Sequence, residues 1–148
     1  MMASVLLALC LFSTLAMVGL IWFVQIVHYP MFRNVGEHEF KAYMELHQKL
    51  TFFVVGPFML VEAFSSVALL YWQPPQTDTR LLWIAVGLVL AIWLSTAFLQ
   101  VPRHGVLAKN GYLENHHTAL ISTNWLRTAA WSARGVILVV LMAQMSAA

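Results

Sequence analysis

The chain has 148 residues, of which 61% are hydrophobic and only 9% are charged, and its mean hydropathy is +0.76. Soluble domains are about 45–50% apolar and 25% charged, so this composition excludes a soluble globular protein and a disordered chain. The formal net charge of +2 excludes a polycationic surface, and we expect no nucleic-acid partner. The single cysteine, Cys10, excludes an intrachain disulfide and is expected to be a small packing residue.

Four apolar segments are long enough to cross a bilayer, which takes about 20 residues. They are residues 5–27, 51–72, 81–101 and 126–145. The first is not preceded by Lys or Arg and is longer than the apolar core of a signal peptide, so we expect a retained span. The sequence therefore predicts a single all-α domain over residues 1–148, an integral membrane four-helix bundle in the lipid bilayer.

The three connections between these spans differ in length and charge. Residues 73–79 hold two prolines and polar residues, which predicts a short hairpin. Residues 28–50 and 102–125 carry all six histidines and five Lys or Arg residues, against Arg80 alone beside the hairpin. The positive-inside rule then predicts cytoplasmic long connections and external termini, in what we expect to be a bacterial inner membrane.

Both long connections contain helix signals. Residues 36–50 lack proline, have acids near their start and repeat apolar residues at helical spacing, so helix two is expected to begin near Glu37. Asn110 and Gly111 predict a turn, after which residues 112–145 can form one helix. Helices two and four are therefore expected to extend beyond the bilayer.

The two halves of the chain resemble each other. Residues 23–30 contain an aromatic residue, Gln25, His28 and Pro30, and residues 98–104 contain an aromatic residue, a glutamine, a proline and a histidine. This pattern favours a duplicated helical hairpin, and chance similarity is the alternative.

Four histidines are expected to converge at the cytoplasmic end of the bundle: His28, His47, His104 and His117. Each lies near the end of a different predicted span, and bundle cores often hold metal or haem between facing helices. We therefore interpret them as candidate ligands of iron, copper, zinc or a haem. The alternative for each is an interfacial or hydrogen-bonded core residue, and His38 and His116 are expected to be solvated.

Ionisable residues inside the spans are the candidate catalytic groups. Glu62 lies in the middle of span two, while Arg127 and Arg134 lie seven residues apart on one face of span four. One interpretation is that the arginines bind an acidic or quinone-like oxygen and that Glu62 or a histidine moves a proton. The alternative is a structural Glu62–Arg134 ion pair, with Arg127 reaching the headgroups. Pro57 is expected to kink span two beside them.

Aromatic and amide side chains at helical spacing predict a pocket for a lipophilic small molecule. The candidate substrate-binding residues are Trp93, Gln100, Asn124 and Trp131. Plain packing is the alternative for the aromatic residues.

Two short motifs carry a resemblance to a known family. The first span ends near His28-Tyr29-Pro30, and Asn124-Trp125-Leu126-Arg127-Thr128 opens the last span. In these motifs and its span layout the chain resembles small four-span bacterial membrane proteins of the anthrone-oxygenase type. The resemblance implies cofactor-poor oxygenation of an aromatic, polyketide-like substrate, with Asn124 and Arg127 at the matching positions. The additional histidines depart from that pattern.

Three functions follow from these patterns. The first is a metal- or haem-dependent inner-membrane oxidoreductase that acts on a lipophilic substrate at the cytoplasmic side. The second is a non-enzymatic membrane protein, either an assembly subunit or a small transporter, which with four spans would have to form a homodimer. The third is a metal-free, quinone-binding redox subunit.

Overall fold

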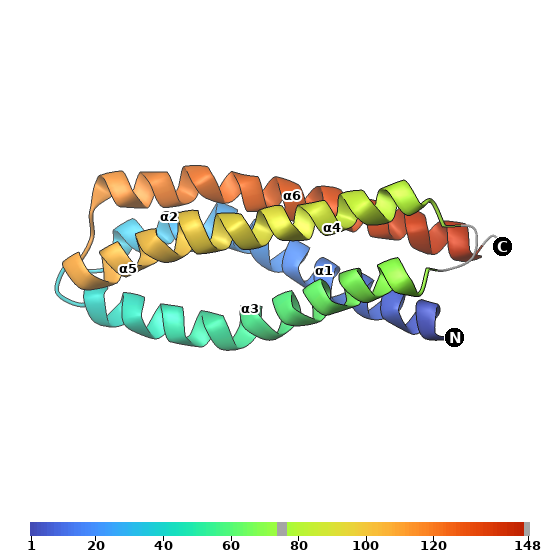
Figure 1. Cartoon of the computed structure of the whole chain (residues 1–148). Coiled ribbons are helices and arrows are strands. Elements are labelled where there is room, and N and C mark those ends of the chain that lie inside the picture. The colour runs from blue at the N-terminus through green and yellow to red at the C-terminus, as the bar shows by residue number, and fades with distance from the viewer. Residues whose placement is uncertain (74–76, 147–148) are drawn as a thin grey trace.

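A computed structural model describes residues 1–73 and 77–146, and every regular element in these ranges is helical. The chain forms four long helical segments that lie side by side (Figure 1). The elements are α1 (Met2–Phe23), α2 (Tyr29–Met31), α3 (Phe40–Tyr71), α4 (Thr79–Ser95), α5 (Val101–Asn110) and α6 (Glu114–Ser146). Each of the four segments is long and apolar enough to cross a membrane, which confirms the predicted membrane bundle.

The beginning of α1 and the end of α6 lie at one end of the bundle (Figure 1). Two short turns, residues 35–39 and 111–113, lie at the opposite end. We call this second end the histidine end, because all six histidines lie in the parts of the helices next to it or in its turns. Residues 74–76, the prolines of the predicted hairpin among them, lie outside the described residues.

The bundle has an apolar interior and an equally apolar outer surface. Phe32, Met44 and Trp131 belong to a core cluster toward the histidine end, while Leu69 and Leu138 belong to a second cluster toward the termini. Large apolar side chains also cover the outside, including Phe52, Phe64, Phe98 and Val136. Such side chains are stable against lipid tails, so the surface agrees with a bilayer environment.

Segments one and three each contain a π-helical turn just before a proline. Residues Val24–His28 precede Pro30, and residues Thr96–Gln100 precede Pro102. Proline lacks an N–H and its ring collides with the carbonyl one turn earlier, so one extra residue in that turn relieves the conflict. The two halves therefore share a local distortion at the positions where their sequences resemble each other.

Because of these π turns, segments one and three continue past their prolines. They end at Asn34 and Asn110, so they extend beyond the predicted spans just as segments two and four do. α3 begins at Phe40, three residues after the expected start, and α6 begins at Glu114. The predicted turn is present: Gly111 ends α5 with φ 89°, a conformation that glycine adopts without strain.

α3 bows away from the rest of the bundle near its middle (Figure 1). Pro57 lies inside this helix and removes one backbone hydrogen bond there, as the sequence predicts. The bow leaves space between α3 and the neighbouring helices at the level of Pro57, which lines the cavity described below.

Candidate functional site

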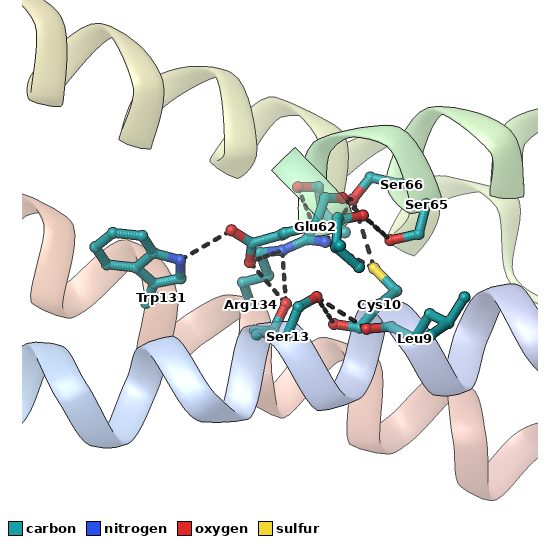
Figure 2. A network of polar contacts seen from close by, with 11 residues as sticks. Leu9, Cys10, Ser13, Glu62, Ser65, Ser66, Trp131 and Arg134 are labelled. Atoms are coloured by element: carbon teal, nitrogen blue, oxygen red, sulfur yellow. Dashed lines mark hydrogen bonds and ion pairs between the residues drawn. The ribbon is translucent and has the colours of Figure 1, made fainter. Parts of the chain in front are cut away.

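The predicted ion pair is present in the core of the bundle. Arg134 Nε donates to Glu62 Oε1 at 2.8 Å, and both side chains are 0% exposed. The same carboxylate accepts hydrogen bonds from Thr14 Oγ1 (2.7 Å) and Trp131 Nε1 (3.0 Å). Figure 2 shows Trp131, Glu62 and Arg134 along this network. The charge of Glu62 is thus matched by three donors from two other helices.

The guanidinium of Arg134 is satisfied as fully as the carboxylate. Nη1 donates to the Ala85 carbonyl (2.6 Å), and Nη2 donates to Ser66 Oγ (2.6 Å) and Cys10 Sγ (2.9 Å). Cys10 therefore accepts a hydrogen bond in addition to packing. Neither Glu62 nor Arg134 lines the cavity described next, so this network joins helices and has no free group for a ligand.

A cavity of about 920 Å³ lies between α1, α3, the segment of α4 and α5, and α6. Most of its lining is apolar, and parts of the lining are exposed on the outer surface, for example Phe52 at 69% and Phe53 at 64%. The cavity therefore opens toward the lipid, and its volume suits a drug-sized molecule.

The polar groups of the cavity gather toward the histidine end. They are His28, Tyr29, His47, Gln48, Thr51, Thr96, Gln100, His104 and Arg127. The two π turns contribute His28, Thr96 and Gln100, because the extra residue in each turn changes which side chains face the interior. An apolar chamber with a polar end is a common design for binding a lipophilic molecule that has a polar head.

Three of the four predicted histidine ligands come together there. His28 Nε2 lies 3.1 Å from His47 Nδ1, and the rings of His47 and His104 stack with centroids 5.4 Å apart. His104 Nδ1 faces the Gln100 carbonyl at 2.9 Å, so this nitrogen carries the proton and the neutral ring has its lone pair on Nε2. Within residues 1–73 and 77–146, no group of three or more His, Cys, Asp or Glu side chains is arranged to hold a metal ion.

His117 does not join these three histidines. Its Nε2 donates to the Tyr29 carbonyl (2.7 Å), and its Nδ1 lies 3.0 Å from the Tyr112 hydroxyl. Burial raises the pKa of Tyr112 to about 12, and the hydrogen bond from its hydroxyl to Glu114 acts in the same direction. Both nitrogens of His117 are therefore engaged, and the ring fastens α6 to the first segment.

Arg127 is held at the cavity by neutral groups. Its Nη2 and Nε donate to Asn124 Oδ1 at 2.6 and 3.0 Å, and weaker contacts reach Tyr29 Oη and Thr96 Oγ1, both at 3.3 Å. Asn124 Nδ2 in turn donates to Gln25 Oε1 at 2.8 Å. Asn124 does not line the cavity, so its observed role is to orient the guanidinium.

The two glutamines of the internal similarity are in different situations. Gln25 donates to the Ile121 carbonyl and accepts from Asn124, so its amide is satisfied. Gln100 lines the cavity and donates to Thr123, but its buried Oε1 has no hydrogen-bond partner. A buried acceptor without a donor is unusual and marks Gln100 as a candidate ligand contact.

The structure thus divides the predicted site residues into two groups. Those that line the cavity are His28, His47, Trp93, Gln100, His104, Arg127 and Trp131. Those that do not are Glu62, His117, Asn124 and Arg134. Sequence reasoning missed Tyr29 and Gln25 as partners of Arg127 and Asn124, although Gln25 occupies the position equivalent to Gln100 in the internal similarity.

Comparison of the chain with models of protein families, with curated proteins and with solved structures gives no match. The function is therefore inferred from the geometry of the cavity.

Proposed function

We propose that the protein binds a lipophilic, quinone-type molecule from the bilayer and exchanges protons with its oxygen atoms, as a quinone-binding redox subunit or oxidoreductase. One observation carries this proposal: an otherwise apolar cavity, open to lipid, places Arg127 beside three histidines at its polar end. The guanidinium and the Tyr29 hydroxyl can donate hydrogen bonds to a carbonyl oxygen of the quinone, and His104 Nε2 can accept one from a hydroxyl of the quinol.

Reduction of a quinone to a quinol adds two electrons and two protons, forming two O–H bonds. The histidines of the cavity are the groups of this chain that carry protons to and from the oxygens. The electrons come from a redox partner of the metal-centre or haem class, to which we assign no residues of this chain.

Quinone binding can be measured by quenching of tryptophan fluorescence in nanodiscs with decyl-ubiquinone as the probe. Trp93 lines the cavity. Trp83 lies on the same helix, does not line the cavity and is 60% exposed. We expect saturable quenching, of which Trp93→Phe removes a larger share than the matched control Trp83→Phe. Non-saturable quenching that both variants reduce equally would show partitioning into lipid and would overturn the proposal.

A metal-dependent oxidoreductase is the second candidate, favoured by the pair His28 and His47. Two nitrogens bound to one ion at about 2.0–2.1 Å lie roughly 3.0–3.4 Å apart, and these two nitrogens are 3.1 Å apart. The carbonyl that orients His104 is the kind of support that metal-ligating histidines receive. Iron, copper, zinc or haem iron would then lie at the polar end of the cavity.

Metal analysis of gently purified protein tests this candidate. It predicts close to one equivalent of a transition metal or a Soret band, lost in His28→Ala and retained in His38→Ala, where the histidine is exposed. Less than about one-tenth equivalent of metal with no Soret band would remove the candidate and leave the metal-free site.

The histidine end is proposed to face the cytoplasm of a bacterial inner membrane, with both termini outside. Five Lys or Arg residues belong to this end and Arg80 alone to the other, which supports the assignment by the positive-inside rule. Substrate and proton exchange would then take place near the cytoplasmic surface.

A further inference from the structure

The two buried arginines of α6 differ in one respect: only one has a counter-ion. Arg127 and Arg134 lie seven residues apart, and their exposed fractions are 7% and 0%. Arg134 pairs with Glu62, and this is the only ion pair within residues 1–73 and 77–146. All hydrogen-bond partners of Arg127 are neutral oxygens.

A buried cation without an anion is unfavourable, because its lost hydration is only partly replaced by neutral dipoles. The Trp131 ring, 5.7 Å from the Arg127 guanidinium carbon, offsets part of this cost by a cation–π contact. A carboxylate would offset more, as it does for Arg134. Among the residues that line the cavity, Arg127 is the only Arg, Lys, Asp or Glu. The cavity is therefore the place where a counter-charge can approach it.

We propose that the ligand of this cavity is a lipophilic acid that binds as its anion, with the ionised oxygen on the Arg127 guanidinium and the Tyr29 hydroxyl. This inference rests on the proposed function and concerns the hydroxylated, quinol-type form of the ligand, because a quinone itself has no O–H bond. It specifies that this form binds as its anion. The ligand's O–H bond breaks, a histidine of the cavity forms an N–H bond with the proton, and no electrons are transferred. His104 Nε2 is one acceptor that the hydrogen bonds leave free, and its ring lies 5.4 Å from the Tyr29 ring.

Two probes test the inference: 4-octyl-2-nitrophenol and its methyl ether. They differ only in that the acidic hydrogen of the phenol is replaced by a methyl group. Nanodiscs of zwitterionic lipid avoid competing surface charge, and the absorbance of the nitrophenolate reports its ionisation. We expect the protein to bind the phenol at least about tenfold more tightly than the ether. We also expect the pKa of the bound phenol to lie at least about one unit below its value in empty nanodiscs.

Substitution of Arg127 assigns this effect to one residue. Arg127→Gln is expected to abolish both the preference and the pKa shift, whereas Arg127→Lys retains most of the shift. Arg103→Gln is the matched control, because Arg103 lies near the same end but does not line this cavity, and it should change neither quantity. Competition by oleate and by a plain alkylphenol then ranks carboxylate against phenolate as the source of the anionic oxygen.

The outcomes separate this inference from the proposed function. Equal affinity for phenol and ether with an unshifted pKa would overturn the inference even if quinone binding is saturable. Absence of binding for the phenol, the ether and the quinone would overturn both. The comparison of phenol with ether uses the unmodified protein, so it decides the question even if Arg127→Gln does not fold.

Discussion

Glu62→Gln is expected to lower the free energy of unfolding by about 3–5 kcal/mol, which is the usual effect of removing one partner of a buried ion pair. The neutral amide leaves the fully buried Arg134 guanidinium without its counter-ion. The amide fits the site in size, but it also weakens the hydrogen bonds that Thr14 and Trp131 donate to this side chain. The measurement is reversible unfolding in mixed detergent–SDS micelles, followed by far-UV circular dichroism.

A neighbouring serine and a double variant control this prediction. Ser65 is buried on the same helix but bonds only to carbonyls of its own helix, so Ser65→Ala should cost no more than about 1 kcal/mol. Glu62→Leu combined with Arg134→Met should be markedly less destabilising than the sum of the single substitutions, because it removes both charges. If Glu62→Gln costs as little as Ser65→Ala, the pair does not hold the bundle together.

The deep ion pair could be predicted from the sequence because the spans contain so few charges. Glu62 is the only acid inside a predicted span, so two span arginines compete for one carboxylate. The sequence therefore implies that one arginine remains unpaired. The position of Arg127 near the edge of span four favours Arg134 as the partner, but the sequence does not show whether Arg127 reaches the headgroups or stays buried, because that depends on how α6 packs. In the structure Arg134 lies at the level of Glu62 and Arg127 lies at the cavity.

The histidine end shows what periodicity alone does not predict. A proline after an apolar run indicates the end of a helix, yet the π turns before Pro30 and Pro102 allow both helices to continue. The same turns determine which side chains enter the cavity. His117 is separated from the other histidines by hydrogen bonds to the Tyr29 carbonyl and to Tyr112, contacts between segments far apart in the sequence. Three histidines, not four, therefore meet.

Asn124→Asp is expected to reduce affinity for an anionic ligand by about tenfold or more while preserving the fold. Its new carboxylate would occupy the position of the Asn124 oxygen, 2.6 and 3.0 Å from two nitrogens of Arg127. The guanidinium would then have a permanent counter-ion, as Arg134 has. The nitrophenol would bind no better than its methyl ether, and its pKa would return to the value in empty nanodiscs.

Asn124→Ala provides the opposite combination of effects. Loss of the side chain leaves Gln25 Oε1 and Arg127 Nε without a partner and leaves Arg127 Nη2 only its 3.3 Å contact with Tyr29, so the free energy of unfolding should fall by about 1–3 kcal/mol. The cation remains uncompensated, so the preference for phenol over ether should persist. Asn124→Asp should therefore lose anion binding and keep its stability, whereas Asn124→Ala should lose stability and keep anion binding. If Asn124→Asp still binds the phenol about tenfold more tightly than the ether, the ionised oxygen of the ligand does not lie on Arg127.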